Sequence, residues 1–421
     1  MSEAVAEDEK RDGYMRVQLG PTEWIIPEEW EITSIEDCAD YIAGTTFPKE
    51  YQGNSSGELP FYKVSDMSEC RWKMDRANNY ISKDKAEELN ATIASSETTI
   101  FPKLGQALLT NKRRILTQPS VFDNNVAGLV GKDILDRYLF YFLNFTDFSP
   151  YANSGTVPSL SKGDIQSIKL PLPPQHEQRR IADILSTVDK QIQQTDEIIG
   201  NIEDLRFGLM SEFFHTGYFE HSLTEKPTFG QVPEDWEIHE LSQVADVEMG
   251  SSPKSEYYNE TGEGLPFYQA NNEFGYRNPT HDRWCSNPNK TADEGDTLVT
   301  IRGTYVGQVN VAKERCSIGR GLAAVSAKDV DQEYIYHHLA HRERYVKSIA
   351  SGSTFDSINS NELESLSVLV PPPDEQQKIA SCLKSLQKKY LAERKYKQKL
   401  QELKRGLMQD LLTGTVRVDP D

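Results

Sequence analysis

Three histidines are the side chains in this sequence whose spacing could best hold a metal ion. His337 and His338 lie four and three residues before His341, so a helix would place them near one another. The matching positions in the first half of the chain are aromatic. A helix with aromatic residues in one copy and histidines in the other is more typical of packing, so we predict no metal site.

One acidic pair could support a different chemistry. Asp374, Glu375 and Lys378 faintly resemble the metal motif of a nuclease. They directly follow a proline run where a helix is expected to begin, and acidic residues favour a helix N-terminus. No G-x-x-x-x-G-K-[ST] loop, no G-x-G-x-x-G after a strand and no N-P-P-[YF] or D-P-P-Y tetrapeptide of an amino-methyltransferase occurs. The sequence therefore predicts no active site.

Composition limits the remaining functions. The length of 421 residues suggests two to four folded units. The apolar fraction of 37% is enough to form buried cores. The five cysteines form no C-x-x-C pair, so neither a disulfide framework nor a cysteine zinc site is indicated. No long apolar run and no basic leader occurs, and a cytoplasmic protein is expected. The net charge of −19 opposes DNA binding on average, so a DNA-binding function must depend on local charge.

The sequence repeats itself after about 200 residues. Six segments return in the same order, which indicates duplication or a shared constraint. They are Ile26–Ile32 with Val232–Ile238, Ala39-Asp40 with Ala245-Asp246, Leu59–Tyr62 with Leu265–Tyr268, Tyr138–Phe140 with Tyr334–Tyr336, Pro174–Ala182 with Pro372–Ala380, and Gly208–Met210 with Gly406–Met408.

Each half has a mixed block, a proline-rich stop and a long segment without proline. The predicted divisions are a loose acidic N-terminal arm (1–24), a first block (25–170), a helix (171–217), a linker (218–230), a second block (231–369), a second helix (370–414) and a tail (415–421). The predicted fold class is α+β, with two repeated mixed α/β domains separated by a pair of long antiparallel coiled-coil helices.

The two long segments, about 175–215 and 374–412, carry apolar residues at 4-3 spacing. We predict that they pair antiparallel as a rod of about 60 Å, with the two blocks at its opposite ends. Polar interruptions at Thr195, Glu393 and Lys397 are candidates for fixing the register. The predicted pairing residues are Ile181, Leu185, Val188, Ile192, Ile199, Ile202 and Leu209 in one helix, and Ile379, Leu383, Leu386, Tyr390, Leu400, Leu407 and Leu411 in the other.

These repeated motifs resemble one family. The Pro-Pro…Glu-Gln-x-x-Ile-Ala helix start and the Gly-Leu-Met helix end occur twice, together with Pro-Glu-[Glu/Asp]-Trp-Glu, Leu-Pro-Phe-Tyr and the Ile301–Gly307 stretch. In these features the chain, over about residues 25 to 415, is similar to the DNA-specificity subunit of type I restriction-modification systems.

The resemblance implies that this chain recognises DNA and that other subunits carry out catalysis. Each block would be a target-recognition domain that reads one half of an asymmetric, bipartite DNA sequence. The helices would set the spacing and bind two methyltransferase subunits, and motor-nuclease subunits would join the complex. The subunit itself would hold no cofactor, while S-adenosylmethionine, ATP and Mg²⁺ would belong to the partner subunits.

The first block departs from the family pattern. Ser96–Gly105 stands where the second block has Gly295–Thr304, and Asn124–Gly128 faces Ser317–Leu322. Divergence is expected if the two blocks read different bases.

Candidate DNA-contacting residues follow from chemistry, since arginine pairs with guanine, asparagine and glutamine pair with adenine, and hydroxyls and lysines hold phosphates. In the first block they are Lys49, Lys63, Ser65, Lys103, Asn124, Asn125, Ser154 and Thr156. In the second they are Lys254, Tyr257, Gln269, Asn271, Asn272, Arg277, Arg302, Thr304, Arg320, Ser353 and Thr354. Two alternatives stay open: an adaptor with a coiled-coil spacer that does not bind DNA, and a nuclease that uses Asp374, Glu375 and Lys378.

Overall fold

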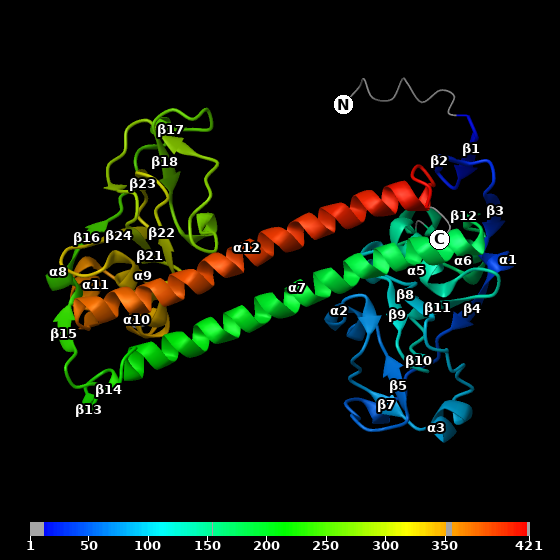
Figure 1. The fold of residues 1–421 in the computed structure, drawn as a ribbon, viewed down its shortest axis with the longest axis horizontal. Coiled ribbons are helices and arrows are strands. Elements are labelled where there is room, and N and C mark those ends of the chain that lie inside the picture. Colours follow the sequence, from blue (N-terminus) through cyan, green and yellow to red (C-terminus); the bar gives the residue numbers. More distant parts are fainter. Residues whose placement is uncertain (1–11, 154, 351–355, 419–421) are drawn as a thin grey trace. The chain divides into compact units, whose positions relative to one another are not determined.

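The computed structural model describes residues 12–153, 155–350 and 356–418, and the order of its elements repeats once along the chain. The chain forms two compact units, residues 1–194 with 398–421 and residues 195–397, here called unit 1 and unit 2. Two long helices, α7 (Gln175–Thr216) and α12 (Pro373–Leu412), run without interruption through the unit boundaries (Figure 1). Each unit therefore contains one mixed block and a part of each long helix.

Unit 1 contains a five-stranded sheet in the order β4-β11-β8-β9-β6 and a three-stranded sheet in the order β10-β5-β7. Its elements before α7 are β1 (Tyr14–Leu19), β2 (Thr22–Pro27), β3 (Glu31–Ser34), α1 (Ile35–Cys38), β4 (Ala39–Ala43), η1 (Lys49–Tyr51), β5 (Leu59–Tyr62), α2 (Asp66–Glu69), β6 (Lys73–Met74), β7 (Tyr80–Ile81), α3 (Lys83–Glu88), β8 (Thr99–Pro102), α4 (Gln106–Leu109), β9 (Arg114–Leu116), β10 (Val121–Phe122), β11 (Val126–Gly131), α5 (Asp136–Phe145), η2 (Ser149–Tyr151), α6 (Lys162–Gln166) and β12 (Lys169–Leu172).

Unit 2 contains a four-stranded sheet in the order β16-β24-β21-β22 and a five-stranded sheet in the order β17-β19-β18-β23-β20. Its elements between the long helices are β13 (Leu223–Lys226), β14 (Gly230–Pro233), β15 (Glu237–Glu240), α8 (Leu241–Val244), β16 (Ala245–Met249), η3 (Ser255–Tyr257), β17 (Tyr258–Asn259), β18 (Leu265–Tyr268), η4 (Asn271–Glu273), β19 (Trp284–Cys285), β20 (Thr291–Ala292), β21 (Thr297–Thr300), β22 (Val309–Val311), β23 (Cys316–Ile318), β24 (Leu322–Ala327), α9 (Gln332–His341), α10 (Glu343–Ala350), α11 (Ser360–Glu364) and β25 (Ser367–Val370).

The first and last strands of each block pair with one another. β3 pairs antiparallel with β12, and β15 pairs in the same way with β25. The tryptophan of the repeated block start, Trp30 in unit 1 and Trp236 in unit 2, is buried just before the first of these strands. The repeated Trp motif and the proline stop therefore mark the two ends of a closed block, as the sequence repeat indicates.

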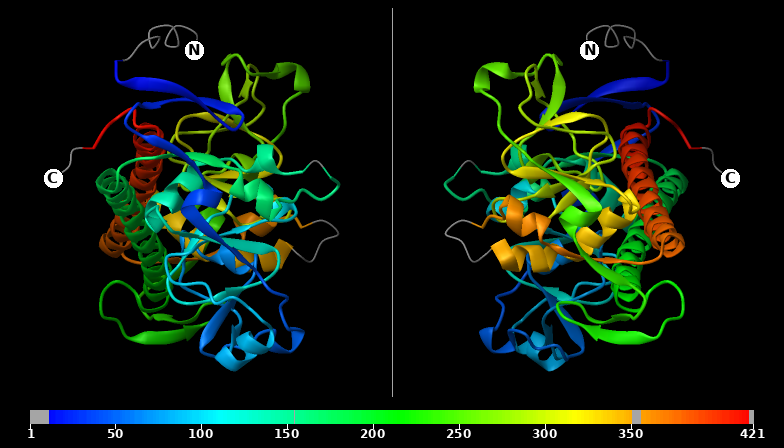
Figure 2. Two further views of the ribbon diagram at one scale, coloured as in Figure 1. Left: turned by 90° about the vertical axis from the view of Figure 1, so that its right-hand side faces the viewer. Right: turned by 90° about the vertical axis from the view of Figure 1, so that its left-hand side faces the viewer.

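Two predictions about connecting segments are wrong. Residues 14–20 were predicted to belong to a loose arm, but β1 pairs antiparallel with β2 as a hairpin. The predicted linker 218–230 contains β13, which forms the equivalent hairpin with β14. The Tyr14 hydroxyl donates to the Gly414 carbonyl at 2.9 Å, and Figure 2 shows the dark blue hairpin beside the red end of α12. The hairpins are short and polar on one side, so neither gave a clear strand pattern.

Each block shares its core with both long helices. In unit 1, residues of α5 form one apolar cluster with Ile181 and Leu185 of α7 and with Met408 and Leu411 of α12. In unit 2 the corresponding cluster joins α9 with Phe213 and Phe214 of α7 and with Ile379 and Leu383 of α12. Burying these helix ends stabilises helix and block together.

The long helices run antiparallel in each unit, which confirms the predicted pairing. Lys404 binds Asp189 at 2.7 Å in unit 1, and Lys397 binds Asp196 at 2.5 Å in unit 2. The two lysines are one heptad apart and so are the two aspartates, as a constant antiparallel register requires. Thr195, the residue before Asp196, is buried. The contact of Lys397 supports the hypothesis that polar interruptions help to fix the register.

The residues predicted for helix pairing are all turned at least partly away from solvent. Ile192, Ile199, Leu209, Leu386 and Leu407 are half-buried. The buried members are Ile181, Leu185, Val188, Ile202, Ile379, Leu383, Tyr390, Leu400 and Leu411. Those near the helix ends contact block cores as well as the other helix, so the seam is a coiled coil only in part.

One buried glutamine attaches each long helix to its own block. In unit 1, Gln178 donates to the Pro173 carbonyl and accepts from Leu135 N, both at 2.8 Å. Its equivalent Gln376 makes the same two bonds, to the Pro371 carbonyl and from Asp331 N, at the same distances. The glutamine of the repeated Glu-Gln motif thus connects the first turn of the long helix to the start of α5 or α9.

The glutamate of the same motif holds the segment that follows the other long helix. Glu375 is buried and accepts hydrogen bonds from Trp236 Nε1, Tyr218 N, Phe219 N and His221 Nε2. These contacts explain the acidic residue without a nuclease site.

In unit 1, Glu177 accepts two bonds from Arg417, at 2.5 and 2.9 Å. The start of each long helix is therefore bound to the chain just beyond the end of its antiparallel partner.

We expect Gln376→Ala to lower the free energy of unfolding by about 2 kcal/mol, because it leaves the partly buried Asp331 amide and the buried Pro371 carbonyl without this partner. Urea unfolding monitored by circular dichroism measures the change. The control is Gln377→Ala, an exposed neighbour on the same helix turn. Equal effects of the two substitutions would show that the glutamine does not attach the helix.

The stability of unit 2 should depend on pH through His221, which lies 2.9 Å from Glu375 and 3.0 Å from Asp235. Burial alone lowers the pKa of His221, but the hydrogen bond and charge of Glu375, with the charge of Asp235, raise it above 6.5. A raised folded-state pKa stabilises the fold fully below pH 6.5, and this contribution is lost as pH rises through the folded-state pKa. Unfolding titrations of wild type and His221→Gln should therefore differ more at about pH 6 than at about pH 8.5. Equal differences between the two proteins at both pH values would show that the contacts of His221 do not cause this pH dependence.

Candidate nucleic-acid interface

Two parallel strands end side by side at one edge of unit 1. β5 and β10 pair in parallel, with Tyr62 opposite Phe122. Because the carboxyl ends of parallel strands meet at the same edge, Lys63 and Asp123 leave the pair together. The Asp123 amide donates to the Tyr62 carbonyl at 2.9 Å, which keeps the two departing segments in contact.

A hollow of about 540 Å³ lies at this edge. It brings together four of the residues predicted to contact DNA, from three separate segments of the sequence. Its lining residues are Thr46, Phe47, Lys49, Gln52, Lys63, Asp123, Asn124 and Asn125.

The polar groups of the hollow are held in place by one another. The Lys63 ammonium lies 3.6 Å from the centre of the Phe47 ring and donates to Gln52 Oε1. Asn125 N donates to the Asp123 carboxylate at 2.9 Å. Burial raises the pKa of Asp123. The side chains of Asn124 and Lys49 are exposed at this hollow, so they are the groups that a ligand would meet first.

Unit 2 has the same edge with different side chains. β18 and β23 pair in parallel, with Tyr268 opposite Ile318, and Gly319 N donates to the Tyr268 carbonyl at 2.8 Å. This bond is the equivalent of the Asp123 bond in unit 1. Gln269 therefore occupies the place of Lys63, and Arg320 occupies the place of Asn124.

The loop before η3 borders this second edge. Arg320 N donates to Ser252 Oγ at 3.2 Å; Lys254 follows on the same loop, and Tyr257 is the last residue of η3. Lys254 is among the more exposed side chains of unit 2, with 79% of its side chain accessible. The loop approaches closely because Gly250 has no Cβ; one added there would lie 2.2 Å from the Gly319 carbonyl oxygen.

An exposed turn after β21 completes the edge in unit 2. The Ile301 amide donates to the Gly321 carbonyl at 2.9 Å, so the turn starts beside the Arg320 loop. Arg302 and Thr304 are exposed on it, and Gly303 has the left-handed φ of +89° that the turn requires. Arg302 also forms an isolated bridge with Ser357.

Unit 1 builds the same turn without an arginine. The Lys103 amide donates to the Asn125 carbonyl at 2.9 Å, and Leu104 bridges Ser159. Gly105, with φ of +71°, takes the place of Gly303, so Leu104 stands where unit 2 has Arg302. Leu104 was not predicted as a site residue. A glycine at the same distance after a buried strand in both halves was the signal that could have located it.

The structure places the other predicted residues as follows. Ser65 is exposed two residues after Lys63, Lys103 is half-buried, and Thr156 is exposed in the loop after η2. Asn271 and Asn272 lie in η4, directly after the Gln269 edge, and Asn271 Nδ2 is 3.4 Å from Gln308 Oε1. The remaining three, Ser154, Ser353 and Thr354, lie outside the described residues.

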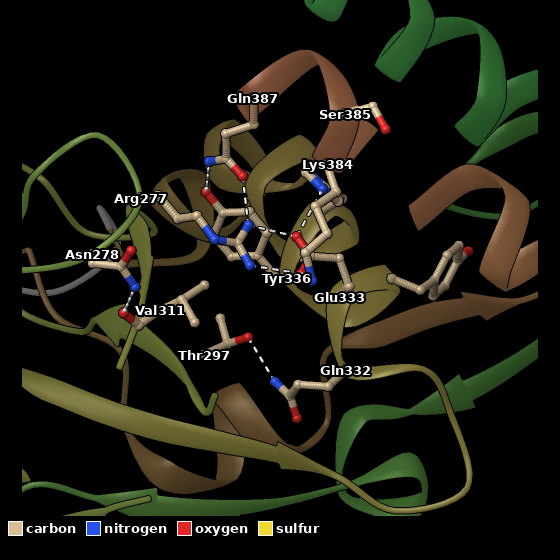
Figure 3. Close-up of polar contacts among 12 residues, drawn as sticks. Arg277, Asn278, Thr297, Val311, Gln332, Glu333, Tyr336, Lys384, Ser385 and Gln387 are labelled. Carbon is tan, nitrogen blue, oxygen red and sulfur yellow. Dashed lines mark hydrogen bonds and ion pairs between the residues drawn. The ribbon is translucent and has the colours of Figure 1, made fainter. Parts of the chain in front are cut away.

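Arg277 is placed away from the exposed part of the edge. Its guanidinium nitrogens contact the two carboxylate oxygens of Glu333 at 2.5 and 2.6 Å, and its side chain is only 17% exposed (Figure 3). An arginine already held by a carboxylate is poorly available to a base, so we leave Arg277 out of the proposed contact set.

The three histidines of α9 have structural contacts. His337 is buried and lies 3.3 Å from Glu333, while His338 Nε2 accepts from Leu369 N at 3.2 Å. The His341 ring stacks on Phe214 at 5.0 Å between ring centres, and burial lowers the pKa of His341 to about 4. Within the described ranges, no group of three or more His, Cys, Asp or Glu side chains is arranged to hold a metal ion.

Known proteins share this architecture. The family model of the type I restriction modification DNA specificity domain matches the chain twice, at residues 27–204 and 233–404. The chain belongs to this family. A specificity subunit of Methanocaldococcus jannaschii, named for the type I restriction enzyme MjaX, is 28% identical over 97% of this chain and 98% of its own length. The MjaVIII specificity subunit of the same organism is 24% identical over 93% and 94%.

The fold is also that of a solved structure. A type I restriction-modification S subunit from M. genitalium matches with a TM-score of 0.63 at 16% identity, over 91% of this chain and 96% of that chain. The predicted fold class and the predicted role as a specificity subunit, rather than a catalytic subunit, are confirmed. Among the described residues, no helix is both long and apolar enough to span a membrane.

Proposed function

We propose that this specificity subunit binds DNA through the two strand edges and directs a type I restriction-modification complex to an asymmetric bipartite target. One observation carries the proposal: the two edges share a backbone but differ in side chains. Lys63, Asn124 and Leu104 in unit 1 stand where unit 2 has Gln269, Arg320 and Arg302. Two unlike readers imply two unlike half-sites.

The side chains suggest what each edge reads. In unit 2, Arg302 and Arg320 can each pair with the O6 and N7 atoms of guanine, and Gln269 can pair with adenine. In unit 1, Asn124 suits adenine and Leu104 suits the methyl group of thymine. Lysines and hydroxyl groups around both edges would hold phosphates and fix the orientation of the duplex.

The acidic composition shapes the expected affinity. With a net charge of −19, the chain as a whole repels DNA, and the basic groups of the two edges act locally. We therefore expect modest, salt-sensitive binding by the isolated chain and tighter binding in a complex whose other subunits add positive charge.

The long helices offer surfaces for protein partners. Several large apolar side chains on them are exposed, among them Phe207 with 70% of its surface accessible. Exposed apolar groups of this kind mark interaction surfaces. The exposed large apolar residues along the helices are Ile198, Leu205, Phe207, Leu391, Tyr396 and Leu403.

We propose that two methyltransferase subunits dock on these helices and that motor-nuclease subunits join them. In this complex the helices set the spacing between the half-sites. S-adenosylmethionine, ATP and Mg²⁺ would be bound by the partner subunits, and the complex would work in the cytoplasm.

Sequencing of methylated DNA tests the proposal directly. The chain is expressed together with its methyltransferase subunit in a host without other methylation, and the host DNA is read for modified bases. We expect one motif with two different half-sites and a fixed gap. A complex that assembles but leaves no discrete methylated motif would instead support a non-DNA-binding adaptor.

We predict that Arg302→Ala and Arg320→Ala each weaken binding of the complex to its target by about 1–3 kcal/mol, the usual contribution of a bidentate base contact. Binding is measured by fluorescence anisotropy against the target and against variants of the second half-site. A base contact should lose discrimination at one position, whereas a phosphate contact should weaken binding to every sequence and flatten the salt dependence.

The matched control is Lys328→Ala, an exposed basic residue of unit 2 that pairs with Asp246 at the other end of β24. If the two arginine variants bind as the Lys328 variant does, the edge of unit 2 is not the DNA-contacting surface.

A further inference from the structure

Arg277 lies at the centre of a network that joins three segments of unit 2. Besides Glu333 of α9, its guanidinium contacts Gln387 Oε1 of α12 and lies 5.2 Å from the centre of the Tyr336 ring. Gln387 Nε2 in turn donates to the Tyr336 hydroxyl at 2.9 Å. Figure 3 shows the guanidinium enclosed by these three side chains.

Glu333 is the acidic centre of the network. Lys384 of α12 reaches its second carboxylate oxygen at 2.8 Å, and His337 faces its first oxygen at 3.3 Å. Glu333 is 12% exposed and Gln387 is buried, so these bonds are shielded from water. Burial raises the pKa of Glu333, but hydrogen bonds from His337, Arg277 and Lys384 outweigh it and hold the pKa well below the usual range. The carboxylate therefore stays charged and keeps its partners.

The segment that carries Arg277 comes directly from the recognition edge. It follows η4, and Asn310 Nδ2 holds it through the Gly275 carbonyl at 2.8 Å. The ring of Tyr276 stacks on Tyr390 of α12, with 3.9 Å between ring centres and 15° between planes. Residues 275–277 thus connect the edge to the long helix by one aromatic contact and one hydrogen bond from the Arg277 guanidinium to Gln387.

Unit 1 uses different chemistry at the same place. In unit 2 the Val311 amide donates to the Arg277 carbonyl. In unit 1 the Ile115 amide makes the equivalent bond to the Trp72 carbonyl, so Trp72 occupies the position of Arg277. Trp72 packs on Phe140, with 6.2 Å between ring centres, where unit 2 has Tyr336. Unit 1 therefore has a contact between two aromatic rings where unit 2 has a bidentate arginine–carboxylate pair, which adds geometric specificity.

We propose that Arg277, Glu333 and Gln387 are positioning residues that fix the second recognition edge on α12 and so restrict the half-site spacing that the complex accepts. This inference depends on the proposed function. Removing one partner of a buried ion pair is costly when the other charge is left alone, but Glu333 would keep Lys384 and His337 after the loss of Arg277. A buried pair of this kind can select one geometry among several. The network would therefore act on the precision of spacing as well as on the stability of the fold.

Arg277→Met and Arg277→Lys test the proposal in the complex with the methyltransferase subunit. Methylation rates are compared on DNA with the wild-type gap and with gaps one base pair shorter or longer. We expect either variant to reduce the preference for the correct gap by about tenfold, equal to 1.4 kcal/mol. Discrimination among bases within the second half-site should change by less than about twofold. Lysine keeps the charge but loses the bidentate geometry, so it should not restore the preference.

Three comparisons keep the outcome decisive. Lys328→Met, which removes the surface partner of Asp246, should leave the gap preference unchanged. If Arg277→Met does not fold, Lys384→Met removes a more exposed member of the network and should give a smaller loss of the same preference. A wild-type gap preference in the folded variants, or lost base discrimination in the second half-site, would overturn the proposal. A wild-type complex without any bipartite motif would overturn the proposed function instead.

Discussion

Each long helix is attached at its first turn by a buried glutamine, and the rest of the structure depends on that attachment. Gln178 and Gln376 satisfy a carbonyl of the proline stop and an amide at the start of α5 or α9. Proline interrupts the backbone hydrogen bonding between block and helix, so a side chain must supply the connection. The glutamates beside them bind the chain just beyond the end of the antiparallel partner, so the same turn attaches the helix to its block and to this segment.

The two recognition edges have the same backbone arrangement but different side chains. The parallel strand pairs β5–β10 and β18–β23 bring two loops to one edge in each unit, and the loops differ in charge and shape. A parallel pair is well suited to this purpose, because the residues that leave it are held by the sheet but do not contribute to it. Sequence can then change at the edge with little effect on the core.

The sequence predicted the large features because they depend on repeated local patterns. The 4-3 apolar spacing located both long helices, and the paired motifs identified the duplication. The hairpin β1–β2 was missed because short two-stranded segments carry little periodicity. The surroundings of Leu104 and Arg277 could not be predicted for a different reason: they depend on contacts with residues far away in sequence. Nothing near Arg277 shows that Glu333 and Gln387 enclose it.

The discontinuity of unit 1 bears on how the chain folds during synthesis. Its core cluster includes Met408, Leu411 and Leu412, which leave the ribosome long after the residues of α5 that they cover. Part of the apolar surface of the first block therefore stays exposed until the end of α12 has been translated. Contacts over such long sequence separation form slowly and leave exposed surface open to aggregation. Nascent chains of this protein should accordingly benefit from chaperones that shield the first block until translation ends.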